Sequence, residues 1–233
     1  VANAEGTTIE NCSVSYINDG TANISDINGN KLSSATIGGL VGNAQETKIL
    51  NCFARDIFVN IKIGTSNGIG GIVGRFTGEI IGCYSIGQIK TNTQNIGGIF
   101  GRTLDTRKWV EREYVKEPNI CNNCYSAVNI KTDSTNIGGI GGWADTSIIA
   151  EITDNISIGN LYTSLAGSNT NSNRVIGNIS STTYTNYAYA AQLINGFKVS
   201  SKDSNYKRGA KYVVEKESLL NNYNNMFNEE YYE

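Results

Sequence analysis

The stretch NIGGIFGR, residues 95–102, decides the fold because the chain repeats it. Similar stretches are GIGGIVGR at 68–75, TIGGLVGN at 36–43 and NIGGIGGW at 136–143, and RVIG, ending at Gly177, is a shorter fifth copy. Their last glycines lie 32, 27, 41 and 35 residues apart. Periods of roughly 20–50 residues are typical of solenoids and other repeat arrays.

A cysteine accompanies most copies of this stretch, namely Cys12, Cys52, Cys83 and Cys124. The distance from the last glycine to the next cysteine is 10, then 9, then 23 residues. The long interval contains LDTRKWVEREYVKE, residues 104–117, which matches nothing in the other repeats. Removing these 14 residues restores a distance of 9, so we interpret 104–117 as an insertion into one repeat.

The later repeats lack the cysteine, and we expect Ile156 and Tyr187 to occupy its position. Each follows an asparagine, as most of the cysteines do. The asparagines concerned are Asn11, Asn51, Asn123, Asn155 and Asn186, with Gly82 as the exception. Stacked asparagine amides at this position would hydrogen-bond from one repeat to the next.

The repeat unit at residues 69–95 contains three short runs, IGGIVG, EIIGCYS and GQIKT. Each is too short for a helix and is rich in residues that favour strands. Three strands per repeat predict an all-β fold, a three-sided parallel β-solenoid of about five to six coils stacked about 4.8 Å apart. Parallel crossovers favour a right-handed coil.

We assign a structural role to the repeated glycines, because no lysine follows them as in a P-loop and no helix opens after them. We expect them to turn the corners of the coil, through positive φ angles or the close approach of another backbone. The repeat residues are Gly38, Gly39, Gly42, Gly70, Gly71, Gly74, Gly97, Gly98, Gly101, Gly138, Gly139 and Gly142, with Cys12, Cys52, Cys83 and Cys124.

The composition indicates one elongated globular domain. The chain has 233 residues, of which 39% are hydrophobic and 17% are charged, with 26 glycines and one proline. No apolar run approaches the ~20 residues that span a bilayer, and no basic amphipathic stretch suits a membrane surface. A net charge of −2 argues against a nucleic-acid partner.

We interpret the cysteines as buried, unreactive thiols, although disulfides between stacked coils are geometrically conceivable. Cys121 and Cys124 form CNNC, but a zinc site would need a second such pair or histidines. The chain contains no histidine, which excludes histidine-based triads and histidine-ligated zinc sites. We expect no catalytic residue, metal or cofactor in this chain.

One segment partly matches a calcium-binding loop. Asp26, Asn28 and Asn30 have the spacing of the first ligands, but Lys31 and Ile37 stand where the loop needs Gly and Glu. We therefore interpret the segment as a turn.

The repeats resemble the GLUG motif, in which GGLVG is followed by a spacer and NCYS. The matching stretches are IGGLVG with ILNCFA, IGGIVG with IIGCYSIGQI, and IGGIFG with NNCYSAVNI. The later stretch from DNISIGN through RVIGN to NYAYAAQLING resembles the N-terminal region of Gram-positive zinc metallopeptidases of the immunoglobulin-A-protease type. Together the two resemblances cover about residues 35–200.

This resemblance implies a non-catalytic part of a longer, secreted or cell-wall-associated protein. The zinc-binding His-Glu-x-x-His of the family has no counterpart here, so no catalytic residue is transferred. The absence of an initiator methionine and of a signal peptide fits a fragment of a longer chain.

We divide the chain into a repeat domain, residues 1–186, and a capping or junction segment, 187–233. The latter has apolar residues at helical spacing, which predicts a short amphipathic helix containing Leu219, Leu220, Tyr223, Met226 and Phe227. In the insertion, aromatic and basic residues typical of binding hot spots suggest partner contacts. They are Arg107, Lys108, Trp109, Arg112 and Tyr114. The alternative is that Trp109 merely packs on the side of the solenoid.

Three functions remain open. The leading one is a scaffold or binding module of a surface metallopeptidase, which contacts other domains of the same polypeptide and its protein substrate. The second is an adhesin module that binds a host protein or glycan. The third is a carbohydrate-cleaving solenoid enzyme that uses carboxylates, although the acidic residues do not recur at matching repeat positions.

Overall fold

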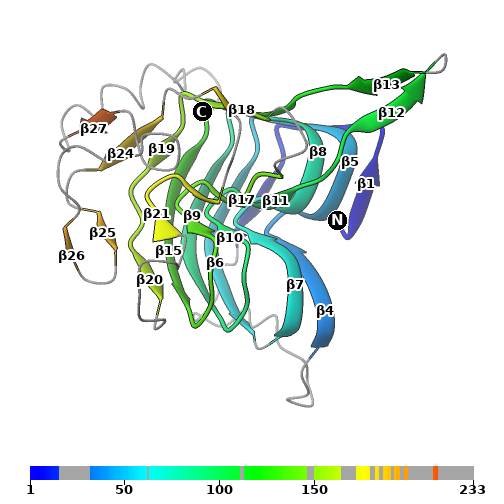
Figure 1. The fold of residues 1–233 in the computed structure, drawn as a ribbon. Coiled ribbons are helices and arrows are strands. Elements are labelled where there is room, and N and C mark those ends of the chain that lie inside the picture. Colours follow the sequence, from blue (N-terminus) through cyan, green and yellow to red (C-terminus); the bar gives the residue numbers. More distant parts are fainter. Residues whose placement is uncertain are drawn as a thin grey trace.

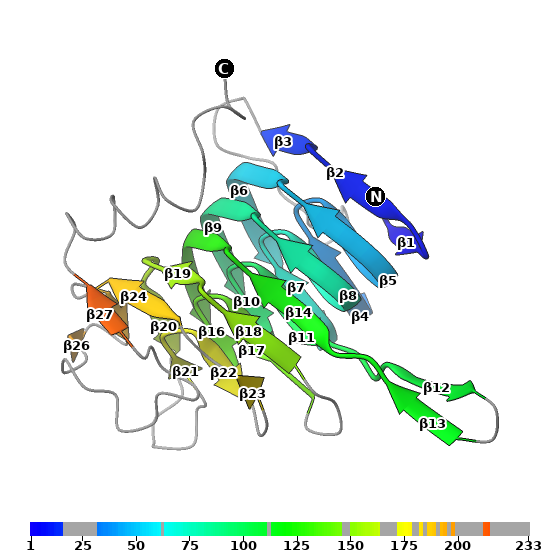
Figure 2. The ribbon, with the colours of Figure 1, turned by 90° about the horizontal axis from the view of Figure 1, so that it is seen from above.

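The chain folds into parallel β-sheets, as the computed structural model in Figures 1 and 2 shows. The structure describes residues 1–15, 32–61, 63–110, 113–145, 150–163 and 172–178, and shorter stretches at 182–183, 186–189, 192–194, 197–198 and 212–214. These residues form strands, turns and loops, with no helix among them. The predicted all-β class is therefore confirmed for the described part of the chain.

Three sheets, here called A, B and C, make up the body, and their strands pair in parallel except for one antiparallel pair in sheet B. Sheet A contains β1 (Asn3–Glu5), β2 (Thr8–Glu10), β5 (Val41–Leu50), β8 (Val73–Ile81), β11 (Phe100–Thr103), β14 (Asn119–Asn122), β17 (Gly141–Trp143), β18 (Ala150–Thr153), β22 (Ile176–Asn178) and β23 (Thr182–Thr183). Sheet B contains β3 (Ser13–Ser15), β6 (Phe53–Ile61), β9 (Tyr84–Thr91), β15 (Tyr125–Thr132), β19 (Ile156–Ser157), β20 (Leu161–Thr163), β24 (Tyr187–Tyr189), β25 (Leu193–Ile194), β26 (Phe197–Lys198) and β27 (Tyr212–Val214). Sheet C contains β4 (Leu32–Gly38), β7 (Ile63–Gly70), β10 (Ile96–Gly97), β16 (Ile137–Gly138) and β21 (Ser172–Asn173).

Successive repeats pass through sheets C, A and B in turn and pair in register with the repeats on either side. Ile96 lies between Ile69 and Ile137 in sheet C, for example, and Tyr125 lies between Tyr84 and Ile156 in sheet B. Figure 2 shows these strands as a stack seen from above. The arrangement is consistent with a parallel β-helix, while its handedness and number of coils stay predictions.

The corners of the repeat fall inside two of the runs that we predicted as single strands. In the unit at 69–95, β7 ends at Gly70 and β8 begins at Val73, so IGGIVG bends in its middle. Likewise β8 ends at Ile81 and β9 begins at Tyr84, so EIIGCYS contains the second corner. The predicted strand boundaries were therefore wrong, because a bend inside an apolar run does not change its sequence pattern.

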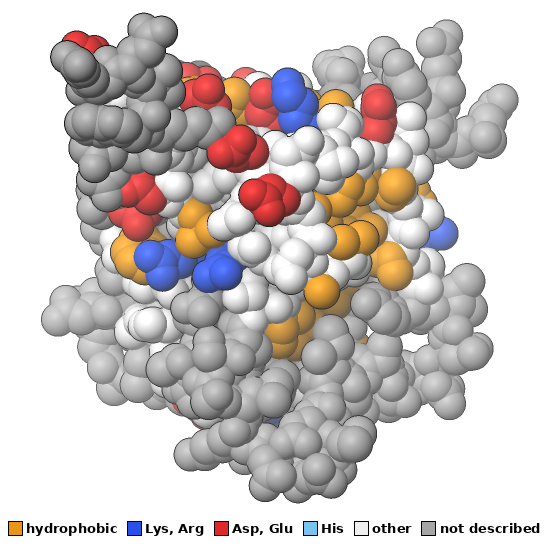
Figure 3. Space-filling model, turned by 90° about the vertical axis from the view of Figure 1, so that its right-hand side faces the viewer, with side chains coloured by type: hydrophobic (Ala, Val, Ile, Leu, Met, Phe, Trp, Pro, Cys, Tyr) orange, Lys and Arg blue, Asp and Glu red, His pale blue; other side chains and the backbone are white. Residues whose placement is uncertain are grey.

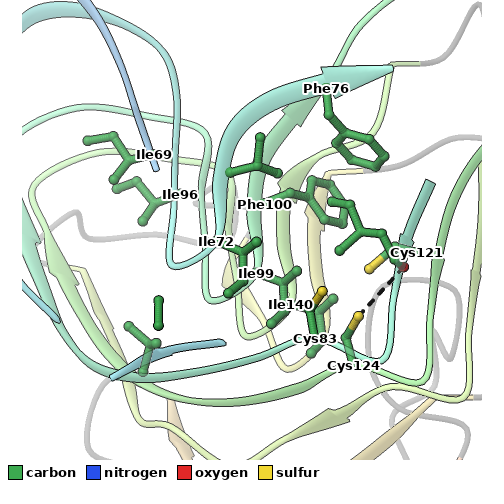
Figure 4. Close-up of a cluster of buried hydrophobic side chains, with 14 of the residues drawn as sticks. Ile69, Ile72, Phe76, Cys83, Ile96, Ile99, Phe100, Cys121, Cys124 and Ile140 are labelled. Carbon is green, nitrogen blue, oxygen red and sulfur yellow. Dashed lines mark hydrogen bonds between the residues drawn. The ribbon is translucent and has the colours of Figure 1, made fainter. Parts of the chain in front are cut away.

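Columns of buried aliphatic side chains form the core between the sheets (Figure 4). Ile72, Ile99 and Ile140 form one such column, and all three are fully buried. Phe76 and Phe100 meet edge to face, with their ring centroids 5.2 Å apart. Full burial of one such side chain stabilises the fold by about 1.5–3 kcal/mol, so each added repeat strengthens a core that no single repeat could form.

The repeated glycines are needed for close packing. A methyl group on Gly71 would lie 2.7 Å from Cβ and 2.8 Å from Oγ of Ser85 and would overlap the carbonyl oxygen of Gly98. The second glycine of each IGG run faces a small residue of sheet B in the same way. The facing residues are Ala54, Ser85, Ser126 and Ser157.

The expectation of positive φ angles at the repeat glycines was wrong. Positive φ occurs instead at Asn11, Asn51, Asn123 and Asp154, with values of 50–57°, at the first residue of the second corner. Gly82 occupies the same position with a φ of 63°, which explains why glycine replaces asparagine there. Asparagine and aspartate tolerate this left-handed conformation better than other non-glycine residues.

The expected position of Ile156 and Tyr187 was also wrong, by one residue. Both pair with the outer column of Phe53, Tyr84 and Tyr125. The inner column of cysteines therefore continues as Asn155 and Asn186, which are buried.

The substitution is possible because an amide oxygen can accept the hydrogen bond that a thiol accepts in the earlier repeats. Sγ of Cys52 accepts the N–H of Cys12, and Sγ of Cys83 accepts the N–H of Cys52, each at 3.4 Å. In the next steps Oδ1 of Asn155 accepts the N–H of Cys124 at 2.9 Å, and Oδ1 of Asn186 accepts the N–H of Asn155 at 3.1 Å. The inner column thus changes from thiols to amides without a change of register.

Some predictions concern residues outside the described part of the chain. They include the turn at Asp26, Asn28 and Asn30 and the helix containing Leu219, Leu220, Tyr223, Met226 and Phe227. The boundary at residue 186 likewise stays a prediction.

Candidate functional site

The insertion forms a β-hairpin that projects from sheet A (Figures 1 and 2). Its strands are β12 (Arg107–Val110) and β13 (Glu113–Lys116), paired antiparallel. Arg107, Lys108 and Trp109 belong to β12, and Tyr114 lies directly opposite Trp109 on β13. Arg112 lies outside the described residues. The hairpin therefore brings the predicted contact residues other than Arg112 onto one element.

Sheet A accommodates the hairpin without losing its register. The strand before the insertion, β11, and the strand after it, β14, both pair with the single long strand β8. Asn119 fixes the base, since its Nδ2 donates to the Leu104 carbonyl at 2.9 Å and its Oδ1 accepts the Gly78 N–H at 3.0 Å. The N–H of Leu104 donates to the Phe76 carbonyl at 2.9 Å. The hairpin thus leaves the sheet from a fixed base.

A cleft of about 190 Å³ lies at this base. It is lined by Glu5, Gln45, Glu46, Thr77, Gly78, Leu104, Asp105, Thr106, Glu117 and Pro118. Four of these side chains are carboxylates, and Figure 3 shows acidic side chains on this end of the molecule beside a hydrophobic area. Within the described ranges, however, no group of three Asp, Glu or Cys residues is arranged to hold a metal ion. We therefore call this feature the acidic cleft and assign it no metal.

Next to the cleft, one register position of sheet A carries an outward column of donor-rich side chains. It comprises Asn43 of β5, Arg75 of β8, Arg102 of β11 and Trp143 of β17, which pair in that order. We call it the Arg–Trp column. Cleft residues Gln45 and Thr77 follow Asn43 and Arg75 by two positions, about 7 Å along an extended strand.

The two arginines of the column are held by different neighbours. Nε of Arg75 donates to Oδ1 of Asn43 at 2.7 Å. The guanidinium of Arg102 stacks on the ring of Trp143, 3.9 Å from its centroid, and its Nη2 lies 3.5 Å from Oδ2 of Asp145. Cation–π stacking of a partly buried arginine contributes about 0.5–2 kcal/mol, so Trp143 keeps Arg102 in place.

This column has more hydrogen-bond donors than acceptors. Within the described part of the chain, Nε of Arg102 and Nε1 of Trp143 are buried and have no acceptor. Over the same residues, Arg75 has no carboxylate within ion-pair distance. Buried donors without acceptors are rare in folded proteins and call for an explanation.

The described cysteines are free thiols, and most of them are buried. Cys52, Cys83, Cys121 and Cys124 are buried, and Cys12 is exposed at the end of the column. Burial raises the pKa of Cys83 and of Cys124 well above its usual range, and the hydrogen bond with the Cys83 thiol raises the pKa of Cys52. These three thiols stay protonated at neutral pH, whereas nucleophilic attack and metal binding need the thiolate.

Sequence reasoning missed the Arg–Trp column, although its signal was present. Each member directly follows the last glycine of a repeated stretch, as in GLVGN, GIVGR, GIFGR and GIGGW. The residue after these glycines varies among the repeats, so the repeat pattern alone does not single it out.

The fold resembles that of a candidate immunoglobulin A1 protease from Bacteroides ovatus, known from a crystal structure. The two chains are 19% identical, the match covers 84% of this chain and 70% of the other, and the TM-score is 0.51. At this identity the similarity shows a shared fold. No family model matches the chain, and no curated protein matches it. The GLUG resemblance therefore stays a prediction, and a Gram-positive origin gains no support.

The described residues include no helix that is long and apolar enough to cross a membrane.

Proposed function

We propose that this chain is a non-catalytic module of a secreted or surface-located protease of the immunoglobulin-A-protease type. In this role a closed, three-sided β-solenoid holds a protein substrate or the protease domain in position, and the hairpin makes the specific contacts. The observation that carries the proposal is the fold shared with the Bacteroides ovatus protein over 84% of the chain.

The hairpin supports a role in binding. It departs from a regular repeat and projects beyond the sheets, and its base is fixed by the hydrogen bonds of Asn119. Aromatic and arginine residues are common at the centres of protein interfaces, and Trp109 pairs with Tyr114 across this hairpin. A rigid base lowers the entropy that binding would otherwise cost.

The proposal is tested by measuring binding of the full 233-residue chain to immobilised immunoglobulin A1, with immunoglobulin G as the control protein. We expect selective binding that falls at least tenfold in the double variant Trp109→Ala, Tyr114→Ala. The matched control is Tyr162→Ala, which removes a 43% exposed tyrosine from sheet B. This control should bind like the unmodified chain.

Incubation of immunoglobulin A1 with the chain alone should leave the immunoglobulin intact. Cleavage would refute the non-catalytic role. Equal binding by the hairpin variant and the unmodified chain would refute the role of the hairpin. Binding to a glycan array but to neither immunoglobulin would favour the adhesin function instead.

A further inference from the structure

The Arg–Trp column is an arrangement that the proposed function does not explain. Its two arginines occupy neighbouring strands at the same register position, where paired residues are about 5 Å apart. Like charges on neighbouring strands destabilise each other. Among described residues only Asp145 lies within ion-pair distance of either guanidinium, at 3.5 Å from Arg102. The column therefore carries excess positive charge on a chain whose net charge is −2.

The contacts of the column leave its donors available in a defined place. Asn43 uses one edge of Arg75, through Nε, and among the described residues no carboxylate pairs with the terminal nitrogens of that guanidinium. Arg102 cannot swing away freely, because Trp143 stacks on it. Nε of Arg102 and Nε1 of Trp143 are buried and have no acceptor within the described chain, so contact with a partner is left to the terminal guanidinium nitrogens. A planar acceptor with two oxygens matches such forked donors best.

We propose that Arg75 and Arg102 together bind the carboxylate of an Asp or Glu side chain in an extended peptide segment of a partner protein. Trp143 and Asn43 are positioning residues, which hold the two guanidinium groups but do not themselves bind the ligand. The inference rests on the proposed function and names the chemistry that the partner presents next to the hairpin.

The acidic cleft decides between kinds of anionic ligand. It begins about 7 Å from the Arg–Trp column along the same strands, the distance between residues i and i+2 of an extended peptide. Carboxylates line this cleft, which favours a neutral or basic residue over a second anion there. Polyanions such as nucleic acids or sulfated glycans are therefore poor ligands, whereas a single carboxylate flanked by neutral or basic residues fits.

The inference is tested with blocked synthetic peptides and the full chain, using calorimetry at low salt. The probe is a Ser/Thr-rich hexapeptide that contains one Glu and a Lys two residues later. Its comparison peptides replace the Glu by Gln, or the Lys by Glu. We expect each replacement to weaken binding at least tenfold, because the first removes the carboxylate and the second places an anion at the cleft.

Variants of the protein locate the site. Arg75→Gln and Arg102→Gln should each weaken binding at least tenfold, and Arg75→Lys should give an intermediate loss because it keeps the charge but not the fork. The control Lys48→Gln removes a positive charge elsewhere on sheet A, where Lys48 pairs with Glu79 at 2.9 Å. It should bind like the unmodified chain. Arg75→Gln keeps the test decisive if Arg102→Gln does not fold, as judged by circular dichroism.

The result that would overturn the inference is equal binding of the Glu and Gln peptides, or an equal loss in Lys48→Gln and Arg75→Gln. The two proposals fail separately. Immunoglobulin binding that needs the hairpin but not Arg75 would remove the inference and leave the proposed function. Peptide binding that needs Arg75, without any binding of immunoglobulin, would remove the proposed function and leave the inference.

Discussion

Replacing Asn155 by alanine is expected to destabilise the fold strongly, because this buried amide joins three repeats. Its Oδ1 accepts the N–H of Cys124 at 2.9 Å, and its Nδ2 donates to the Cys121 carbonyl and to Oδ1 of Asn186, both at 2.9 Å. Alanine removes these three bonds, together with a longer one that the Cys121 thiol donates to Oδ1 at 3.8 Å, and leaves a buried N–H without an acceptor. At about 1 kcal/mol per bond and about 1–3 kcal/mol for an orphaned donor, the free energy of unfolding should fall by about 4 kcal/mol.

Asn155→Cys should be milder, since it extends the thiol column by one repeat. Its Sγ can accept the N–H of Cys124, as Sγ of Cys83 accepts the N–H of Cys52 at 3.4 Å. We expect at least about 1.5 kcal/mol of the loss to be recovered, the value of one satisfied buried N–H. Urea unfolding followed by circular dichroism, with reductant present, gives both values by linear extrapolation.

Asn129→Ala is the matched control for these variants. Asn129 is exposed on sheet B and accepts one hydrogen bond, from the N–H of Asn160 at 2.9 Å. Its loss should lower the free energy of unfolding by less than about 1 kcal/mol. The reasoning is refuted if Asn155→Ala costs no more than Asn129→Ala, or if Asn155→Cys is no better than Asn155→Ala.

Two further predictions concern packing and pH. Gly71→Ala should lower the free energy of unfolding by about 3 kcal/mol or more, because its methyl group collides with Ser85 and with a neighbouring backbone. Gly6→Ala is the control, since a methyl group there meets no atom within 4 Å and only the φ of 57° is unfavourable. It should lower the free energy of unfolding by only about 1 kcal/mol in the same unfolding assay. Raising the pH should also destabilise the fold, because Cys52, Cys83 and Cys124 keep their protons when folded and lose them when unfolded. Stability from these raised pKa values is complete below about pH 8.5 and falls above it, by up to about 1.4 kcal/mol per thiol per pH unit, and replacing all three by alanine should flatten that slope.

The repeat pattern predicted the fold class because glycines and isoleucines recur wherever the same packing recurs. Their spacing could not locate the corners, since a bend inside IGGIVG leaves the apolar run unchanged. It also could not reveal the register of Asn155. Asparagine serves both as the left-handed first residue of the corner, as in Asn51 and Asn123, and as the buried acceptor at its second residue, as in Asn155.

The candidate site was predictable only in part. Residues 104–117 stood out because they interrupt a repeat, and their charged and aromatic composition pointed to binding. Arg75 and Arg102 lie 27 positions apart in the chain and look unrelated until the pairing of β8 with β11 brings them together. Repeat proteins assemble such surfaces from single residues of many repeats, so a site of this kind becomes visible only after the register is known.

The break between β11 and β14 recurs at the same height in the following repeats, between β17 and β18 and between β22 and β23. Sheet A thus contains a row of chain breaks, here called the seam, at which the connecting segment varies in length. Neighbouring breaks are about 5 Å apart, the spacing between paired strands. Segments of different length inserted at this position of successive repeats would leave the sheet side by side. A change of length at this position therefore leaves the stacked interior unchanged.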